Sequence, residues 1–258
     1  MTILFPAPIF GPVHSRRLGT SLGINLLPAD GKVCSFDCVY CECGLKKDFV
    51  PHQKFPTRTE VREALHAQLS KMKDENMAPD VITFAGNGEP TIHPDFAGII
   101  DDTISLRNEF FPNAKVSVLS NAAHISDESV FQALMKVDNN ILKLDTISPE
   151  YIRFIDRPVN KSYDVNKVIE DMKRFNGKCI IQTMFIAGTY EGKSVDNTGD
   201  EYVNPWLEAV KEIKPSEVMI YTIERETPVN TLFKASKESL DSIARKVEEC
   251  GFPCQVSY

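Results

Sequence analysis

Four of the seven cysteines lie close together, at Cys34, Cys38, Cys41 and Cys43. The first three have the spacing Cys-x3-Cys-x2-Cys, which allows one loop to wrap three thiolates around one side of an iron–sulfur cluster. Four-iron clusters more usually take four cysteines, so three would leave one iron open to a small chelating molecule. Zinc with Cys43 as a fourth ligand is the competing interpretation, but structural zinc sites usually pair two separated cysteine pairs. We interpret Cys43, and likewise Cys250 and Cys254, as structural thiols.

An aromatic residue, Tyr40, directly precedes the third cysteine. With it, the cysteine spacing resembles the hallmark motif of the radical S-adenosylmethionine (SAM) superfamily. The resemblance implies a [4Fe-4S] cluster on Cys34, Cys38 and Cys41, with SAM chelating the open iron and Tyr40 beside the cofactor. It also implies reductive cleavage of SAM to methionine and a 5′-deoxyadenosyl radical that abstracts hydrogen from a substrate, and a reductant such as flavodoxin or ferredoxin.

A glycine-rich turn, AGNGEPTIHP, follows the second expected strand. Glycines allow the backbone to approach a ligand closely, and Glu89 offers a carboxylate that can accept from an ammonium group. The turn resembles the GGEP motif of the same superfamily, with Asn87 where the second glycine often stands. The resemblance places Gly86, Asn87, Gly88 and Glu89 at the cofactor, with Gly88 and Glu89 at the methionine amine.

Polar residues also follow the later strands. By resemblance, Ser120, Asn121 and Asp145 match positions that hold the cofactor's ribose or carboxylate. Because side chains alternate along a strand, we expect Lys143 and Asp145 to point inward and Leu142 and Leu144 toward the helices. The same reasoning predicts Thr222 and Glu224 inward, opposite to Met219, Tyr221 and Ile223. The predicted substrate-side residues are Lys143, Gln182, Thr222 and Glu224.

Alternating strand and helix patterns surround these residues. We expect strands at 21–27, 80–85, 115–120, 141–145, 178–186 and 217–223, and helices at 57–73, 95–110, 126–136, 165–175, 204–213 and 237–250. Such repetition predicts an α/β fold, a partial (βα)6 TIM-type barrel of parallel strands with outer helices, whose functional loops lie at the carboxyl ends of the strands. We expect one radical SAM domain over 1–258, with an N-terminal extension at 1–20, a cluster loop at 31–44 and an irregular polar loop, a candidate lid, at 189–203.

Composition limits the other functions. The formal net charge of −7 opposes a large nucleic-acid footprint. The apolar start MTILFPAPIF is short, lacks a basic region and contains prolines, so we expect a cytoplasmic protein without a membrane segment.

The rest of the chain resembles a compact branch of the superfamily usually grouped with wyosine-synthetase-type proteins. The likeness rests on GPVHSRRLGTSLGINLLP before the cysteines, RFIDRP at 153–158 and YTIERETP at 221–228. The tRNA-modifying members carry an additional cysteine set upstream, and this sequence has no cysteine before Cys34. A tRNA-base-modifying enzyme is therefore an alternative that we do not favour. A protein-directed activase or maturase is another, and a non-catalytic iron–sulfur protein is a third that Gly88 and Glu89 disfavour.

Overall fold

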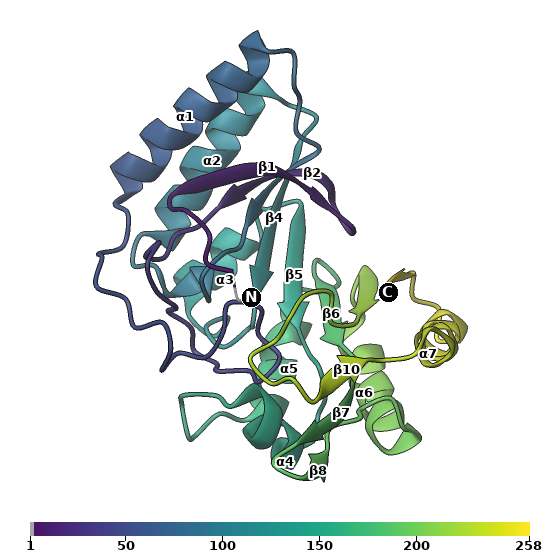
Figure 1. Cartoon of the computed structure of the whole chain (residues 1–258). Helices are drawn as coiled ribbons and strands as arrows, with labels where there is room; N and C mark the ends of the chain where they lie inside the picture. The colour runs from purple at the N-terminus through teal and green to yellow at the C-terminus, as the bar shows by residue number, and fades with distance from the viewer. Residues whose placement is uncertain (1–2) are drawn as a thin grey trace.

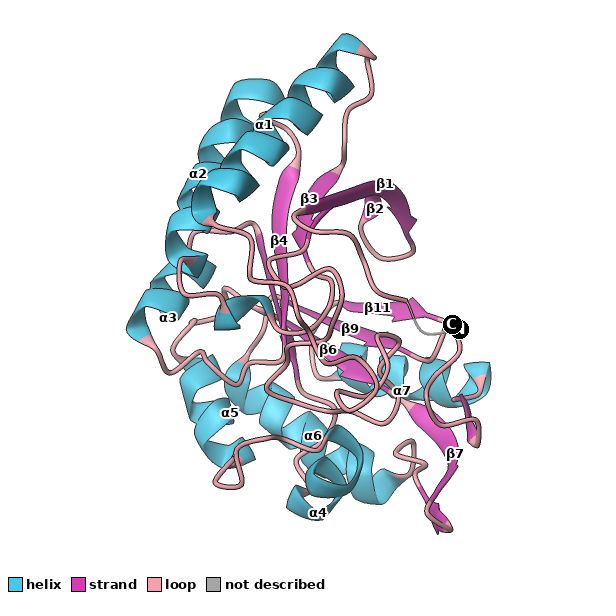
Figure 2. Cartoon of the chain, turned by 60° about the vertical axis from the view of Figure 1, so that its left-hand side comes forward, coloured by secondary structure: helices cyan, strands magenta, loops and turns pink. Residues whose placement is uncertain are grey.

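The computed structural model describes residues 3–258. Within this range eight strands form one curved sheet in the order β1-β2-β3-β4-β5-β6-β9-β11 (Figure 1; β9 and β11 are labelled in Figure 2). Their bounds are β1 Ile9–Ser15, β2 Gly19–Ile24, β3 Val81–Phe84, β4 Lys115–Ser120, β5 Asn139–Lys143, β6 Ile180–Met184, β9 Glu217–Tyr221 and β11 Cys254–Ser257. Every neighbouring pair from β2 to β11 is parallel, and β1 is antiparallel to β2. The predicted partial TIM-type barrel is confirmed.

In the described residues six longer helices follow the parallel strands in turn: α1 Arg58–Asp74, α2 Phe96–Phe110, α3 Glu128–Leu134, α5 Val165–Lys173, α6 Asp200–Ile213 and α7 Lys237–Glu249. Figure 2 shows α1, α2, α3, α5 and α6 along the outside of the curved sheet. Local sequence sets their starts; Thr57, for example, forms a capping box with Glu60 at the start of α1. Nowhere in residues 3–258 is a helix both long and apolar enough to span a membrane.

The structure adds strands that the sequence analysis did not expect. β1 lies inside the predicted extension at 1–20, and β11 adds a seventh parallel strand after the sixth helix. The stretch at 189–203 is not the irregular lid that we expected, because β7 Ile186–Tyr190 turns back into β8 Lys193–Ser194 and α6 starts at Asp200. Asn197 fixes the connection between β8 and α6, because its side chain forms hydrogen bonds with the backbone of Met184 and Ile186. β10 Leu232–Lys234 completes this small sheet on the other side of β7.

Each face of the main sheet carries its own apolar cluster. The larger cluster includes Leu142, Ile181 and Ile220 and packs under the helices. The smaller one lies on the concave face, which we call the lumen, and contains Ile141, Ile180 and Met219 with Leu18 and Leu119 against them. Register places Lys143 opposite Gln182, and Gln182 opposite Met219, so these three residues share the lumen face.

The predicted orientation of β9 was therefore wrong. Met219 lies in the lumen, and Tyr221, two residues further along the same strand, shares that face. Thr222 lies beyond the end of the strand, where its hydroxyl accepts a hydrogen bond from the backbone of Ala235. The start of the strand at Glu217 was predicted correctly, but the polar face was assumed to point inward, whereas the lumen at β9 is lined by the apolar Met219.

Candidate functional site

The cysteine loop at 31–44 follows β2 and lies over the carboxyl ends of the strands. Cys38 is buried, and Cys34 and Cys41 are half-buried, all as free thiols. The Cys34 sulfur accepts from the Phe36 amide at 3.5 Å and from the Asn121 side-chain amide at 3.4 Å. Donors directed at the Cys34 sulfur favour its thiolate form, which is the form that binds metal.

Lys32, two residues before the first cysteine, provides positive charge within this loop. Its side chain is 1% exposed, and its ammonium donates to the Gly44 carbonyl at 2.6 Å and to the Cys41 sulfur. Burial alone would lower the pKa of Lys32, but the three neighbouring cysteines raise it above its ordinary value. Lys32 therefore remains protonated next to three potential thiolates.

Burial affects the cysteines unequally. It raises the pKa of Cys34 to about 11 and that of Cys38 well above its usual value. The pKa of Cys41 falls to about 6, because the side chain and backbone amide of Cys43 and the Lys32 ammonium lie next to its sulfur. Cys43 is thus a neighbour of the cysteine triplet, a position that sequence reasoning did not reveal. Metal coordination would offset the cost of ionising the two buried thiols.

The glycine-rich turn runs directly beneath the cysteine loop. Gly88 and Val33 form an isolated parallel bridge, in which Val33 donates to the Asn87 carbonyl and Glu89 donates to the Val33 carbonyl. A Cβ on Gly88 would lie 1.8 Å from the Val33 carbonyl oxygen, and the φ of Gly88 is +142°. Only glycine meets both conditions. The turn and the cysteine loop are therefore joined through backbone atoms.

Glu89 projects a carboxylate into this junction and is 2% exposed. Its Oε1 accepts from the amide and hydroxyl of Thr91 and from the Ser120 hydroxyl, and its Oε2 accepts from the Asn121 amide at 2.6 Å. All these donors are neutral, and in residues 3–258 no cation pairs with the carboxylate. Burial raises the pKa of Glu89, and these hydrogen bonds oppose the shift.

The other predicted cofactor residues around this turn contact protein groups. Asn87 is fully buried, and its side chain binds both backbone groups of Phe5 and the Pro28 carbonyl. Its side-chain amide therefore fixes the N-terminal segment, while its backbone carbonyl accepts from Val33 of the cysteine loop. The carbonyl of Gly86 accepts from the Cys43 thiol.

A second buried group lies beside Cys38. Lys143 contacts Asp145 and lies 2.9 Å from Asp156 and 2.7 Å from the Tyr40 hydroxyl, which also contacts both carboxylates. The other Asp145 oxygen accepts from the Met184 amide at 3.0 Å. The two carboxylates hold the pKa of Lys143 well above its ordinary value although burial opposes this. Asp145 and Tyr40 are thus fully engaged with this network.

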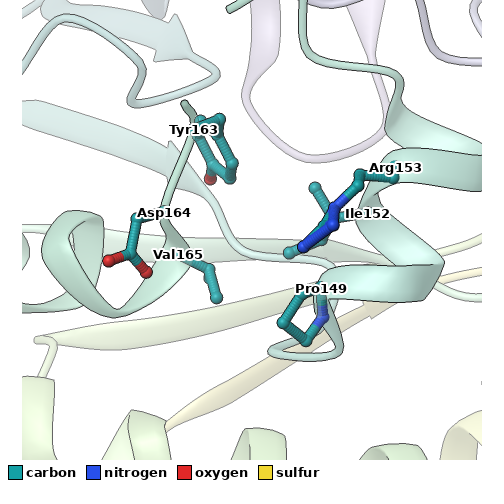
Figure 3. A pocket seen from close by; sticks show the side chains of 6 residues that line it. All are labelled: Pro149, Ile152, Arg153, Tyr163, Asp164 and Val165. Carbon is teal, nitrogen blue, oxygen red and sulfur yellow. The ribbon is translucent and has the colours of Figure 1, made fainter. Parts of the chain in front are cut away.

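Two cavities lead toward this group. The inner one, of about 10 Å³, is lined by Phe36, Asn121, Lys143, Leu144, Asp145, Thr146, Ile152, Asp156 and Tyr163. The outer one, of about 150 Å³, lies between η2 (Ile152–Asp156) with the preceding α4 (Pro149–Tyr151) and the start of α5. Figure 3 shows Tyr163 and Val165 lining it from one side and Ile152 and Arg153 from the other. Ile152 and Tyr163 line both cavities and therefore separate the outer from the inner one.

The structure brings together most of the predicted site residues but not all of them. Gln182 lies in the lumen, where it accepts a hydrogen bond from Arg17. Glu224 pairs instead with the exposed Arg16 at 2.5 Å, and Thr222 binds the backbone of Ala235, so neither joins the group around Cys38. Lys32 and Asp156, which were not among the predicted site residues, also lie next to the cysteines or their neighbours. Asp156 lies in the RFIDRP segment, which was noted only as a likeness of the whole chain.

Comparison with known proteins identifies the family of this chain. The model of the radical SAM superfamily matches residues 30–193. The chain belongs to the radical SAM superfamily. It is 31% identical over 244 residues to a UPF0026 protein from Helicobacter pylori, covering 93% of this chain and 72% of that protein. A UPF0026 protein from Synechocystis is 31% identical over 235 residues, covering 89% of this chain and 80% of that protein.

Solved structures share the fold at low identity. A radical SAM methyltransferase from Sphaerobacter thermophilus superposes with a TM-score of 0.65 and 15% identity, over 92% of this chain and 65% of the other. A structure of TYW1 with a lysine–pyruvate adduct bound gives a TM-score of 0.62 and 12% identity, over 90% of this chain and 74% of the other. Identities this low show the fold alone. Membership of the superfamily implies an enzyme that uses SAM and a [4Fe-4S] cluster and that needs a reductant.

The residues present fit that pair of cofactors. One loop supplies three buried or half-buried thiols, and the buried carboxyl group of Glu89 has only neutral hydrogen-bond partners. In residues 3–258 no three His, Cys, Asp or Glu side chains are close enough to hold a single metal ion. A cubane cluster has a different requirement, because each thiolate binds a separate iron.

Proposed function

We propose that Cys34, Cys38 and Cys41 hold a [4Fe-4S] cluster and that Glu89 receives the ammonium group of SAM. When bound, the cluster and SAM together supply reductive cleavage of SAM to methionine and a 5′-deoxyadenosyl radical, which abstracts hydrogen from a substrate. The substrate occupies the lumen below the cysteine loop. We propose that residues 1–258 act as one radical SAM domain, since β1 and β11 belong to the same sheet.

The uncompensated carboxylate of Glu89 carries this proposal. An ionised carboxylate in the protein interior is costly unless a cation or a metal neutralises it. Four neutral donors orient Glu89, and none of them supplies the missing charge. An ammonium group arriving from the cysteine loop would complete the site. A protein that only stored a cluster would have no use for this arrangement.

The neighbouring residues have supporting roles in this proposal. Ser120 and the Asn121 backbone orient Glu89, and the Asn121 side chain donates to Cys34 and to Ser35. Asp145 holds Tyr40 and Lys143 beside Cys38. We therefore assign Asp145 to positioning this group, and not to the ribose of the cofactor. The proposed electron donor is flavodoxin or ferredoxin.

Anaerobic reconstitution with iron and sulfide tests the proposal. We expect about four iron atoms per chain, a typical content for this cluster type, and formation of 5′-deoxyadenosine and methionine after addition of SAM and dithionite. Cys38→Ala is the matched negative control. Stoichiometric zinc without iron would contradict the cluster assignment, and a loaded cluster that leaves SAM intact would contradict the activity. Deuterium transfer into 5′-deoxyadenosine from labelled small acids, tRNA or peptides would then identify the substrate class.

A further inference from the structure

We propose that the tip of the β1–β2 hairpin forms a binding site for an oxyanion of the substrate, a carboxylate or a phosphate, with Arg17 as its anchor. The inference rests on the proposed function only in placing a substrate in the lumen. The site is made of Arg17, Gln182, Tyr221 and Gln255, which come from four separate strands or turns.

The hairpin tip is held rigidly inside the barrel. The Ser15 hydroxyl accepts from the backbone amides of Arg17 and Leu18, which closes the turn. Leu18 packs into the apolar cluster of the lumen. The Gln255 side chain on β11 donates to the Arg17 carbonyl at 3.2 Å. The backbone of Arg17 is thus fixed from both edges of the sheet, so its side chain is positioned before any ligand arrives.

The side chain of Arg17 has only neutral partners. One of its terminal nitrogens donates to Gln182 Oε1 at 3.0 Å, and its guanidinium lies 4.5 Å from the centre of the Tyr221 ring. No carboxylate of residues 3–258 forms an ion pair with it. Arg16, the adjacent residue, is exposed and pairs with Glu224 at 2.5 Å. A guanidinium has five donors in a planar fork, and most of those of Arg17 have no partner in the described structure.

The surroundings select the kind of ligand. Lys143, Gln182, Met219 and Gln255 lie in one row across the lumen face of β5, β6, β9 and β11. Lys143 at one end of the row is neutralised by Asp145 and Asp156. Arg17 reaches the row from the hairpin turn by bonding Gln182, and it has no counterion among the described residues. A planar fork of donors without an acidic neighbour matches a carboxylate or a phosphate, which can accept two parallel hydrogen bonds.

An unpaired acceptor lies next to the arginine. The Oε1 atom of Gln255 is buried and has no hydrogen-bond partner. Turning the amide over would not help, because its oxygen would then face the Arg17 carbonyl. A buried unpaired acceptor requires a donor, such as a hydroxyl or amine of the ligand or a water. We infer an oxyanion-bearing substrate with a hydrogen-bond donor near the anionic group.

The site also lies at a useful place relative to the chemistry. Tyr221 is the register partner of Met184, whose amide donates to Asp145, and Asp145 contacts Tyr40 beside Cys38. The proposed anion site and the cysteine loop thus contact the same wall of the lumen. An anion held by Arg17 would orient the remainder of the substrate toward the cluster.

Binding of two simple probes to the reconstituted protein tests the inference. Calorimetric titration with inorganic phosphate and, separately, with acetate shows which oxyanion is preferred. We expect Arg17→Gln to weaken binding of the preferred probe by roughly 10- to 100-fold, the range for one charge-assisted interaction. Arg16→Gln is the matched control, because Arg16 is the adjacent, exposed arginine, and it should bind the probe as the wild type does.

Several outcomes would overturn the inference: neither probe binds to the wild type, Arg17→Gln binds like the wild type, or Arg16→Gln loses as much affinity as Arg17→Gln. If Arg17→Gln does not fold, Arg17→Lys provides the comparison. It keeps the charge but loses the fork, so we expect intermediate affinity, and wild-type affinity would overturn the inference. SAM cleavage by the wild type is measured separately, so that failure of the proposed function is distinguished from failure of the anion site.

Discussion

Replacement of Glu89 by glutamine is the most informative single change in the proposed cofactor site. It keeps the shape of the side chain but removes the buried charge that has only neutral partners. A hydrogen bond to a charged group contributes about 1.5 to 3 kcal/mol. We therefore expect the dissociation constant for SAM to rise by roughly 10- to 100-fold. The cluster should still load, because Glu89 contacts none of the three cysteines directly.

Calorimetric titration of SAM into the reconstituted variant measures this effect, and the EPR spectrum of the reduced cluster with and without SAM provides a second readout. Ser120→Ala is the control, since it removes one neutral donor to Glu89 and keeps the charge. We expect it to cost less than about 10-fold in affinity, as one neutral hydrogen bond contributes about 1 kcal/mol. The reasoning would be refuted if Glu89→Gln bound SAM like the wild type while its thermal stability was unchanged.

Four further predictions concern the loop and the turn. Alanine at any of the three cluster cysteines should abolish iron loading, whereas Cys43→Ala should keep it, as an iron and sulfide assay would show. Lys32→Met should make the cluster's reduction potential more negative in a redox titration, because a buried positive charge is lost, and Lys32→Arg should preserve it. Gly88→Ala should destabilise the fold by at least about 1–3 kcal/mol and abolish SAM binding, since the new Cβ meets the Val33 carbonyl. A melting temperature equal to that of the wild type would contradict this. Asn87→Gly should lower stability by about 1–3 kcal/mol through lost hydrogen bonds to Phe5 and Pro28 but leave SAM affinity unchanged.

Local patterns allowed most of the fold to be predicted. The alternating strand and helix patterns gave elements close to those observed, and the six βα units were correct. The cysteine loop and the turn with Gly88 and Glu89 lie together as expected, because both follow neighbouring parallel strands. These features depend on residues close together in the chain, which is where sequence patterns carry most information.

The features that could not be predicted depend on contacts between residues that are far apart in the sequence. Nothing near Asn87 in the sequence indicates that its amide binds Phe5, which is 82 residues away. The inward face of β9 depends on its register with β6. The role of Arg17 was equally hidden. The pair Arg16-Arg17 looks like a solvated basic surface, and only the curved sheet shows that one arginine is exposed and the other lies in the lumen.

The contact between the hairpin tip and β11 has a consequence for the order of folding. The Arg17 carbonyl and the Gln255 amide are separated by 238 residues, whereas Glu89 and Asn121 are separated by 32. Contacts between distant residues form late, because a long loop must close first. We expect a refolding chain to assemble the turn around Glu89 before it fixes Arg17. The chain would then become able to load iron at an earlier stage of maturation than that at which it recognises a substrate.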